Sequence, residues 1–183
     1  MQTKAESRKD LKTEIEDAAR VLIGLEASII RHAGNMRGIH FGKTRESKGT
    51  IVGAYALHIQ CPWRVECRGK IVTGFHDYYV PGSRVNMNTW DPDSARGSLQ
   101  EDRLFEVFNV ELDLDSGRHV GLAGGRFVRK VEGDRFGGLL VGFTGGILLR
   151  VFPAASSGEE WRLLQPRKKA RHFVIEDQSS LLE

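Results

Sequence analysis

The stretch "AYALHIQCPWRVEC", residues 54–67, carries three side chains capable of chemistry, His58, Cys61 and Cys67. Histidine and cysteine are the preferred ligands of zinc, and a thiolate beside an imidazole can act as a nucleophile. However, Cys-x5-Cys is not the Cys-x2-4-Cys spacing of structural zinc sites. In an extended strand the two cysteines would lie about 20 Å apart, at roughly 3.3 Å per residue, unless the chain bends sharply at Pro62. We therefore interpret both cysteines as reduced, small apolar residues, and we expect no metal and no cofactor.

A second group of reactive side chains follows in "FHDYYVPG" and "NTWDPDS". His76 and Asp77 could form an acid–base pocket with His58 if the fold brings them together. Asp91 and Asp93 are also typical of turns when they flank a proline, and a lone histidine on a strand is usually a hydrogen-bonded structural residue. The sequence therefore predicts no catalytic residue, and a small hydrolase or ligand-binding enzyme using His58, His76 and Asp77 is the alternative.

Aromatic and charged residues in the same regions suit contacts with another protein. A tryptophan placed in a loop between acidic residues is a plausible anchor for a partner. Two arginines directly follow Trp63 and Trp161, so alternation along a strand places each arginine on the face opposite its tryptophan. The residues that we expect to contact a partner are Arg64, Trp90, Asp91, Asp93 and Arg162.

The first element that must position these residues is a predicted long helix. Its apolar residues are spaced 4, 3, 4, 3 and 4 apart, as on one stripe of a helix: Leu11, Ile15, Ala18, Leu22, Leu25 and Ile29. Ser7 with Asp10 resembles a capping box, and Gly34 is a favourable stop. The spacing predicts a helix over about 8–33, packed on a sheet. Apolar residues off the stripe, such as Val21 and Ile23, leave a homodimer through this helix open.

Strands dominate the remainder of the chain. Alternating stretches predict strands over 36–42 and 50–60, and a hairpin with its turn at 68–70. Glycine pairs at 124–125, 137–138 and 145–146 separate further strands. Ser98 and Glu101 form a capping box that opens a second, short helix near 98–109. Without alternating strands and helices or a phosphate-binding glycine motif, the predicted class is α+β, a long N-terminal helix on a mostly antiparallel sheet.

Length and composition fit one folded domain over residues 1–183, with loose ends at about 1–7 and 177–183. The chain is 40% hydrophobic and 28% charged, which is ordinary for a folded domain. Its N-terminus is polar and no apolar run approaches the length of a membrane span, so we expect a cytoplasmic protein with no membrane partner. The net charge of +3 is modest and dispersed. Two basic segments, "GKTRESKG" and "RKKAR", leave weak nucleic-acid binding as a further possibility, although an unfavoured one.

The segment "YALHIQCPWR", residues 55–64, resembles the core Y-A-L-H-[IV]-Q-C-P-W-R of a widespread group of uncharacterised small bacterial proteins. Matching pieces continue through "DYYVP", "NTWDPDS", "DRLFEVF", "ILLRVFP", "GEEWRLLQP" and "RHFVIE". The resemblance covers most of the chain from Met36 onward and implies a fold and a cytosolic bacterial origin, with no activity attached. The loop over 84–97 departs from the acidic pattern of that group. The C-terminal strand–turn–strand segment is also similar to those of toxin-immunity proteins, in architecture alone.

These observations predict a noncatalytic module that binds another protein, in an immunity-type or accessory role. The alternative enzyme requires His58, His76 and Asp77 to converge. Nucleic-acid binding would rest on the two basic segments and would weaken steeply with salt.

Overall fold

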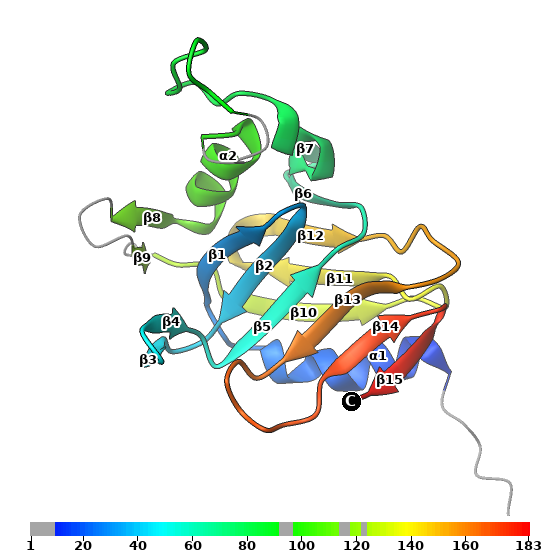
Figure 1. Ribbon diagram of the computed structural model, residues 1–183. Coiled ribbons are helices and arrows are strands. Elements are labelled where there is room, and N and C mark those ends of the chain that lie inside the picture. Colours follow the sequence, from blue (N-terminus) through cyan, green and yellow to red (C-terminus); the bar gives the residue numbers. More distant parts are fainter. Residues whose placement is uncertain (1–9, 92–96, 114–117, 122–123) are drawn as a thin grey trace, which may run out of the picture.

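Two antiparallel sheets form the body of the protein (Figure 1). The computed structural model describes residues 10–91, 97–113, 118–121 and 124–183. The six-stranded sheet has the order β1 (Ala27–Ala33), β2 (Met36–Phe41), β5 (Tyr55–Ile59), β13 (Glu159–Leu164), β14 (Phe173–Glu176) and β15 (Ser179–Leu182). The five-stranded sheet has the order β10 (Val128–Gly133), β11 (Leu139–Phe143), β12 (Ile147–Val151), β6 (Trp63–Cys67) and β7 (Lys70–Gly74). Two hairpins stand apart: β3 (Arg45–Ser47) with β4 (Thr50–Val52), and β8 (Val110–Asp113) with β9 (Arg118–Gly121).

The hydrophobic core lies between the two sheets. Phe41 of β2 stacks on Phe143 of β11 with the ring centroids 6.4 Å apart. Trp161 of β13 is fully buried, and its indole N–H donates to the carbonyl of Gly137 at 2.8 Å. An indole is buried at little cost only when its N–H has such a partner. The alternation of each strand therefore points one set of side chains into this core and the other set outward.

Two short helices pack at different edges of the sheets. The first, α1 (Leu11–Ala19), contacts β10 and β15, and the second, α2 (Leu99–Phe108), contacts β7 and β1. Helix α1 lies very close to β10, because a Cβ added to Gly133 would fall 2.9 Å from the Cβ of Ile15. Glu14 also accepts a hydrogen bond from the hydroxyl of Ser180 in β15. Each helix thus links an edge strand of one sheet to an edge strand of the other.

The prediction of a long helix over 8–33 is wrong, and with it the predicted fold class. The helix begins after its cap Asp10, ends at Ala19 and continues only as the 3₁₀ turn η1 (Arg20–Leu22). Gly24, with φ of +82°, then breaks the helical path, and residues 27–33 form β1. The apolar spacing misled because Ile29 and Ile30 are both buried, on opposite faces of a strand. The described part of the chain is mostly antiparallel sheet with two short α-helices.

The second predicted helix and the predicted hairpin occur where the sequence placed them. Ser98 caps α2 by accepting from the N–H of Glu101 at 3.2 Å, and Asn109, at φ of +56°, ends it. The hairpin of β6 and β7 turns through Arg68 and Gly69, both at positive φ. The predicted strand over 50–60 splits into β4 and β5. The C-terminal end was expected to be loose, but residues 179–182 pair with β14 as β15.

Further expectations concern a homodimer contact near the first helix, the N-terminal end of the chain and membrane spans. Val21 and Ile23 are exposed just after α1, so a homodimer contact there stays a prediction. Residues 1–7 lie outside the described part of the chain. Within that part, no helix combines the length and the apolar character needed to cross a membrane.

Replacing Ile15 with alanine tests the role of α1 in covering the core. Ile15 is fully buried against β10, so Ile15→Ala should lower the free energy of unfolding by about 2–5 kcal/mol through lost burial and a residual cavity. Val21→Ala, at an exposed position, should change it by less than about 0.5 kcal/mol. Urea denaturation followed by circular dichroism measures both, and equal losses would contradict the packing described for α1.

Candidate functional site

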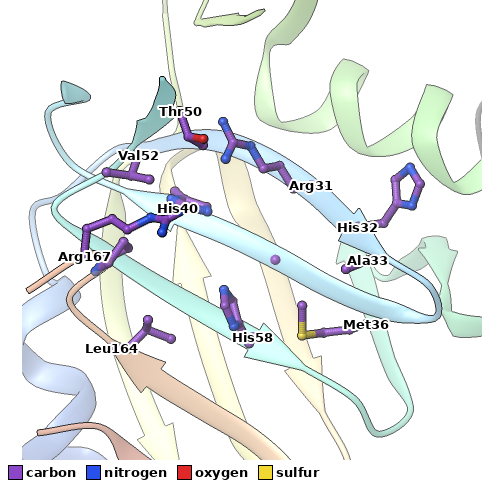
Figure 2. A pocket seen from close by; sticks show the side chains of 12 residues that line it. Arg31, His32, Ala33, Met36, His40, Thr50, Val52, His58, Leu164 and Arg167 are labelled. Carbon is purple, nitrogen blue, oxygen red and sulfur yellow. The ribbon is translucent and has the colours of Figure 1, made fainter. Parts of the chain in front are cut away.

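A pocket of about 350 Å³ opens on the outer face of the six-stranded sheet, away from the core (Figure 2). Figure 2 shows side chains from β1, β2, β5 and β13 around it. The lining residues are Arg31, His32, Ala33, Met36, Gly38, His40, Thr50, Val52, His58, Leu164, Pro166 and Arg167. They come from four strands of the sheet, the β3–β4 hairpin and the segment after β13.

Gly38 forms the floor of the pocket. In the register of the sheet, Gly38 lies opposite Arg31 of β1 and opposite His58 of β5. A Cβ added there would lie 3.6 Å from the His58 ring and 3.8 Å from the carbonyl oxygen of Arg31, which is ordinary contact. The missing side chain therefore leaves a hollow between the two flanking side chains.

The β3–β4 hairpin forms one wall, and two hydrogen bonds hold it against the sheet. The guanidinium of Arg31 donates to the carbonyl of Ile51 at 2.6 Å, and the N–H of Gly53 donates to Nδ1 of His40 at 3.1 Å. Only glycine fits at position 53, because an added Cβ would come within 2.7 Å of the carbonyl oxygen of Phe41. Since Nδ1 of His40 accepts a hydrogen bond, its neutral ring carries the proton on Nε2.

A second wall, which adjoins the hairpin, is formed by the end of β13 and the segment that follows it. Leu164, Pro166 and Arg167 line the pocket from this side. Arg45 of β3 donates to the carbonyl of Pro166 at 2.5 Å, which joins this segment to the hairpin wall. Two segments that are far apart in the sequence therefore enclose one site.

Among the described residues, the lining is cationic and contains no carboxylate. Arg31 and Arg167 both contribute guanidinium groups, and among the described residues neither forms an ion pair. Partial burial lowers the pKa of Arg31 below its usual value. A guanidinium nevertheless stays charged in proteins, so the pocket holds positive charge that no described side chain neutralises.

The surroundings of His58 favour its neutral form. Burial is the main cause that lowers the pKa of His58 below 6.5, and the nearby positive groups Arg162 and His172 lower it further, while Glu159 opposes them. Within the described part of the chain, no hydrogen-bond partner holds its ring. A neutral imidazole at the pocket wall can donate or accept a hydrogen bond to a ligand.

The three residues of the predicted acid–base pocket do not all line this pocket. His58 lines the pocket, whereas His76 and Asp77 lie in the 3₁₀ helix η2 (Phe75–Tyr79), which follows β7 of the other sheet. The carboxylate of Asp77 accepts from the hydroxyl of Thr73 at 2.9 Å and from the N–H of Gly74 at 3.0 Å. Asp77 therefore caps η2 locally.

Both cysteines are free thiols, as the sequence predicts. Burial, with the nearby carboxylate of Glu160, raises the pKa of Cys61 to about 12. A thiol with such a pKa is protonated at neutral pH and is a poor nucleophile. In the described ranges, no group of three or more His, Cys, Asp and Glu side chains could hold a metal ion.

The arginines expected to contact a partner lie on different sheets. Trp63 and Trp161 are buried, so Arg64 and Arg162 lie on the outer faces of β6 and β13, respectively. Arg64 pairs with Glu66 at 2.6 Å and lies over the ring of Phe152. Facing away from one shared core, the two arginines do not belong to one continuous surface.

Arg162 is part of a polar group on the outer face of β13. It pairs with Glu159, and its guanidinium lies 3.1 Å from Nδ1 of His172.

Of the loop residues expected to contact a partner, Trp90 is partly buried and Asp91 is exposed. Asp93 lies outside the described residues.

Sequence reasoning missed Arg31, His40 and Gly38, and it assigned Arg167 only to a basic turn. Arg31 fell inside the wrongly predicted helix, so its outward position on a strand was hidden. Comparisons of the chain with models of known protein families, with curated proteins and with solved structures found no match. The resemblance to the bacterial group and to immunity proteins therefore stays a prediction, and function is argued from the site.

His58 should make stability depend on pH. Because its folded-state pKa lies below 6.5, the unfolded chain binds the proton first, so the free energy of unfolding should fall as pH drops below about 6.5 and through the folded pKa. His58→Gln should lose less stability over the same range. Urea denaturation at several pH values measures this, and a comparison near pH 8, where the imidazole is neutral in both states, isolates the packing effect of the substitution. Parallel pH profiles would contradict the burial described for His58.

Proposed function

We propose that the protein binds a small organic anion, with a phosphate group, in the pocket on the outer face of the six-stranded sheet. The observation that carries the proposal is the pair of guanidinium groups, Arg31 and Arg167, which line one pocket without a carboxylate partner in the described chain. A guanidinium presents a planar set of N–H donors that matches phosphate oxygens. An anionic ligand would supply the charge that the site lacks.

The other walls favour a ligand with an apolar or planar part. Met36, Val52 and Leu164 contribute apolar surface, and His58 contributes a neutral ring. A volume of about 350 Å³ lies at the lower end of the range for small-molecule sites. A nucleoside monophosphate combines a phosphate, a planar base and a size of this order.

The lining supports binding rather than catalysis. Of the residues that the structure describes, none in the lining is a carboxylate or a thiol, and the three residues of the alternative enzyme site are not combined in it. Of the three residues of the alternative enzyme, His58 lines this pocket, and His76 and Asp77 do not.

Arg31→Gln should weaken binding of the anion. A lost hydrogen bond to a charged group is worth about 1.5–3 kcal/mol, so affinity should fall by about tenfold to a hundredfold. Isothermal titration calorimetry with inorganic phosphate, uridine monophosphate and succinate as probes measures this and separates phosphate from carboxylate recognition. Gly38→Ala places a methyl group in the hollow without a close contact. It should weaken the binding of uridine monophosphate more than the binding of inorganic phosphate.

Arg129→Gln is the matched control, because it removes the same charge from an exposed position on β10 of the other sheet. It should leave affinity unchanged. Arg31→Lys keeps the charge but not the planar donor set and should give an intermediate affinity. If no probe binds the wild-type protein, or if Arg129→Gln weakens binding as much as Arg31→Gln, the pocket is not the anion site.

A second candidate function, protein binding, is favoured by exposed apolar side chains in residues 71–91. Ile71, Tyr79 and Met87 are 63%, 54% and 65% exposed, respectively. They belong to β7, η2 and the following loop, the same part of the chain as Trp90 and close in sequence to α2 (Figure 1). Exposed apolar groups that gather in one region are typical of contact surfaces. This is where an immunity-type or accessory role would be exercised.

Trp90→Ala tests the protein-binding function. Truncating an aromatic anchor commonly costs 2 kcal/mol or more, so a partner captured by the tagged wild-type protein should be lost or bound about thirtyfold more weakly. Affinity capture from the host lysate, followed by competition with the purified variant, measures this. Arg129→Gln serves again as a surface control. A partner that binds Trp90→Ala and the wild type equally would remove the loop from the contact surface.

A further inference from the structure

We propose that the pocket receives one unstacked nucleotide of a single-stranded nucleic acid, whose neighbouring phosphates lie along a cationic rim. The cationic rim is defined by two segments, the β3–β4 hairpin region and the loop after β13, and its members are Lys43, Arg45, Lys48, Arg167, Lys168, Lys169 and Arg171. The inference rests on the proposed function and names the class of ligand that the same site takes.

The two segments of the rim are joined to one another and to the pocket. The bond from Arg45 to the carbonyl of Pro166 spans 121 positions in the sequence. Thr50 and Val52 of the hairpin line the pocket, and so do Pro166 and Arg167 of the other segment. Two basic segments that are far apart in the sequence therefore lie together at the opening of the pocket.

The rim is strongly positive and largely unneutralised. It holds seven cations and a single carboxylate, Glu46, although the whole chain has a net charge of only +3. None of the seven forms an ion pair with a described residue. Lys168 instead donates to the side-chain oxygen of Gln165 at 3.0 Å. Charge gathered on one edge of an almost neutral protein is the electrostatic footprint of a polyanion site.

The combination of pocket and rim selects a chain of phosphates rather than one small anion. A ligand that fits within about 350 Å³ occupies the pocket and leaves the exposed lysines of the rim without a contact. A strand of nucleotides places one base in the pocket and further phosphates on the rim. In a duplex each base is stacked and paired, so a single strand enters the pocket at lower cost.

A lipid surface fits the rim less well. Peripheral membrane contacts combine basic residues with apolar side chains that enter the bilayer. The large apolar side chains that are exposed in the described chain, such as Ile71, Met87 and Phe136, lie in other segments. The rim offers charge without that apolar component.

The test compares a fluorescently labelled oligouridylate with uridine monophosphate at several salt concentrations. The wild-type protein should bind the oligonucleotide more tightly than the mononucleotide. The double variant Lys48→Gln/Lys169→Gln, with one change in each segment, should reduce the salt slope of oligonucleotide binding by roughly 0.7 for each lysine removed. It should leave the affinity for uridine monophosphate unchanged, because neither lysine lines the pocket.

Lys70→Gln/Arg129→Gln is the matched control, since it removes two exposed cations from the other sheet. This control should bind the oligonucleotide as the wild type does, and Arg31→Gln should weaken both ligands. Uridine monophosphate binding without tighter oligonucleotide binding, or an unchanged salt slope in the rim variant, overturns the inference and leaves the proposed function standing. Failure of the wild type to bind either ligand overturns both.

Competition separates the remaining sources of phosphate. Unlabelled single strands should displace the labelled oligonucleotide, whereas duplex of the same length should displace it poorly. Vesicles containing phosphatidylserine should do no better than the duplex. Displacement by duplex or by vesicles as efficient as that by single strand would also overturn the inference.

Discussion

The six-stranded sheet is covered on both of its faces where β1, β2 and β5 lie, and the rest of the structure depends on this constraint. Ile30 and Ile39 face the core, while Ile29 and Ala56 are equally buried on the other face. Strands buried on both faces require apolar or small residues at successive positions. The face of the sheet that points away from the core is only partly covered, and the pocket lies in the uncovered part. Fold and site therefore share one cause.

A hydrogen bond from the end of the β3–β4 hairpin gives the buried side chain of His40 a structural role. His40 is 5% exposed, which is tolerated because the N–H of Gly53 donates to it. The same bond fixes the end of the hairpin wall. A comparable junction holds α2: Gln100 accepts from the buried guanidinium of Arg37 and donates to the carbonyls of Gly74 and Phe75 at 2.9 and 3.1 Å. Burial lowers the pKa of Arg37 to about 10. Polar side chains thus attach the peripheral elements to the sheets.

Local signals predicted those parts of the fold that local physics determines. The cap at Ser98 and the turn at Arg68 and Gly69 depend on residues within a few positions, and both were predicted. The helix over 8–33 was wrong because an apolar run buried on two faces matches helical spacing by chance. Gly24 and the adjacent β-branched pair Ile29 and Ile30 were the signals available against it. Packing against segments distant in the sequence decided that residues 27–33 form a strand and not a helix.

The site was less predictable than the fold for the same reason. His58 was noticed because it is a reactive residue type, and the two basic segments were noticed for their charge. Their adjacency was invisible, since the bond from Arg45 to Pro166 joins residues 121 positions apart. Arg31 and Gly38 carry no local signal at all, because their importance comes from the register between β1, β2 and β5.

The construction of the pocket walls has a consequence for how the protein can diversify. The floor belongs to the sheet, whose register is held by core residues on its other face, while both walls belong to connecting segments. Connecting segments tolerate insertion and substitution better than strands do. Descendants of one ancestral chain can therefore acquire different ligand preferences by changing residues 43–53 or 165–171 while the scaffold beneath stays constant, much as antibodies vary their loops on a fixed framework.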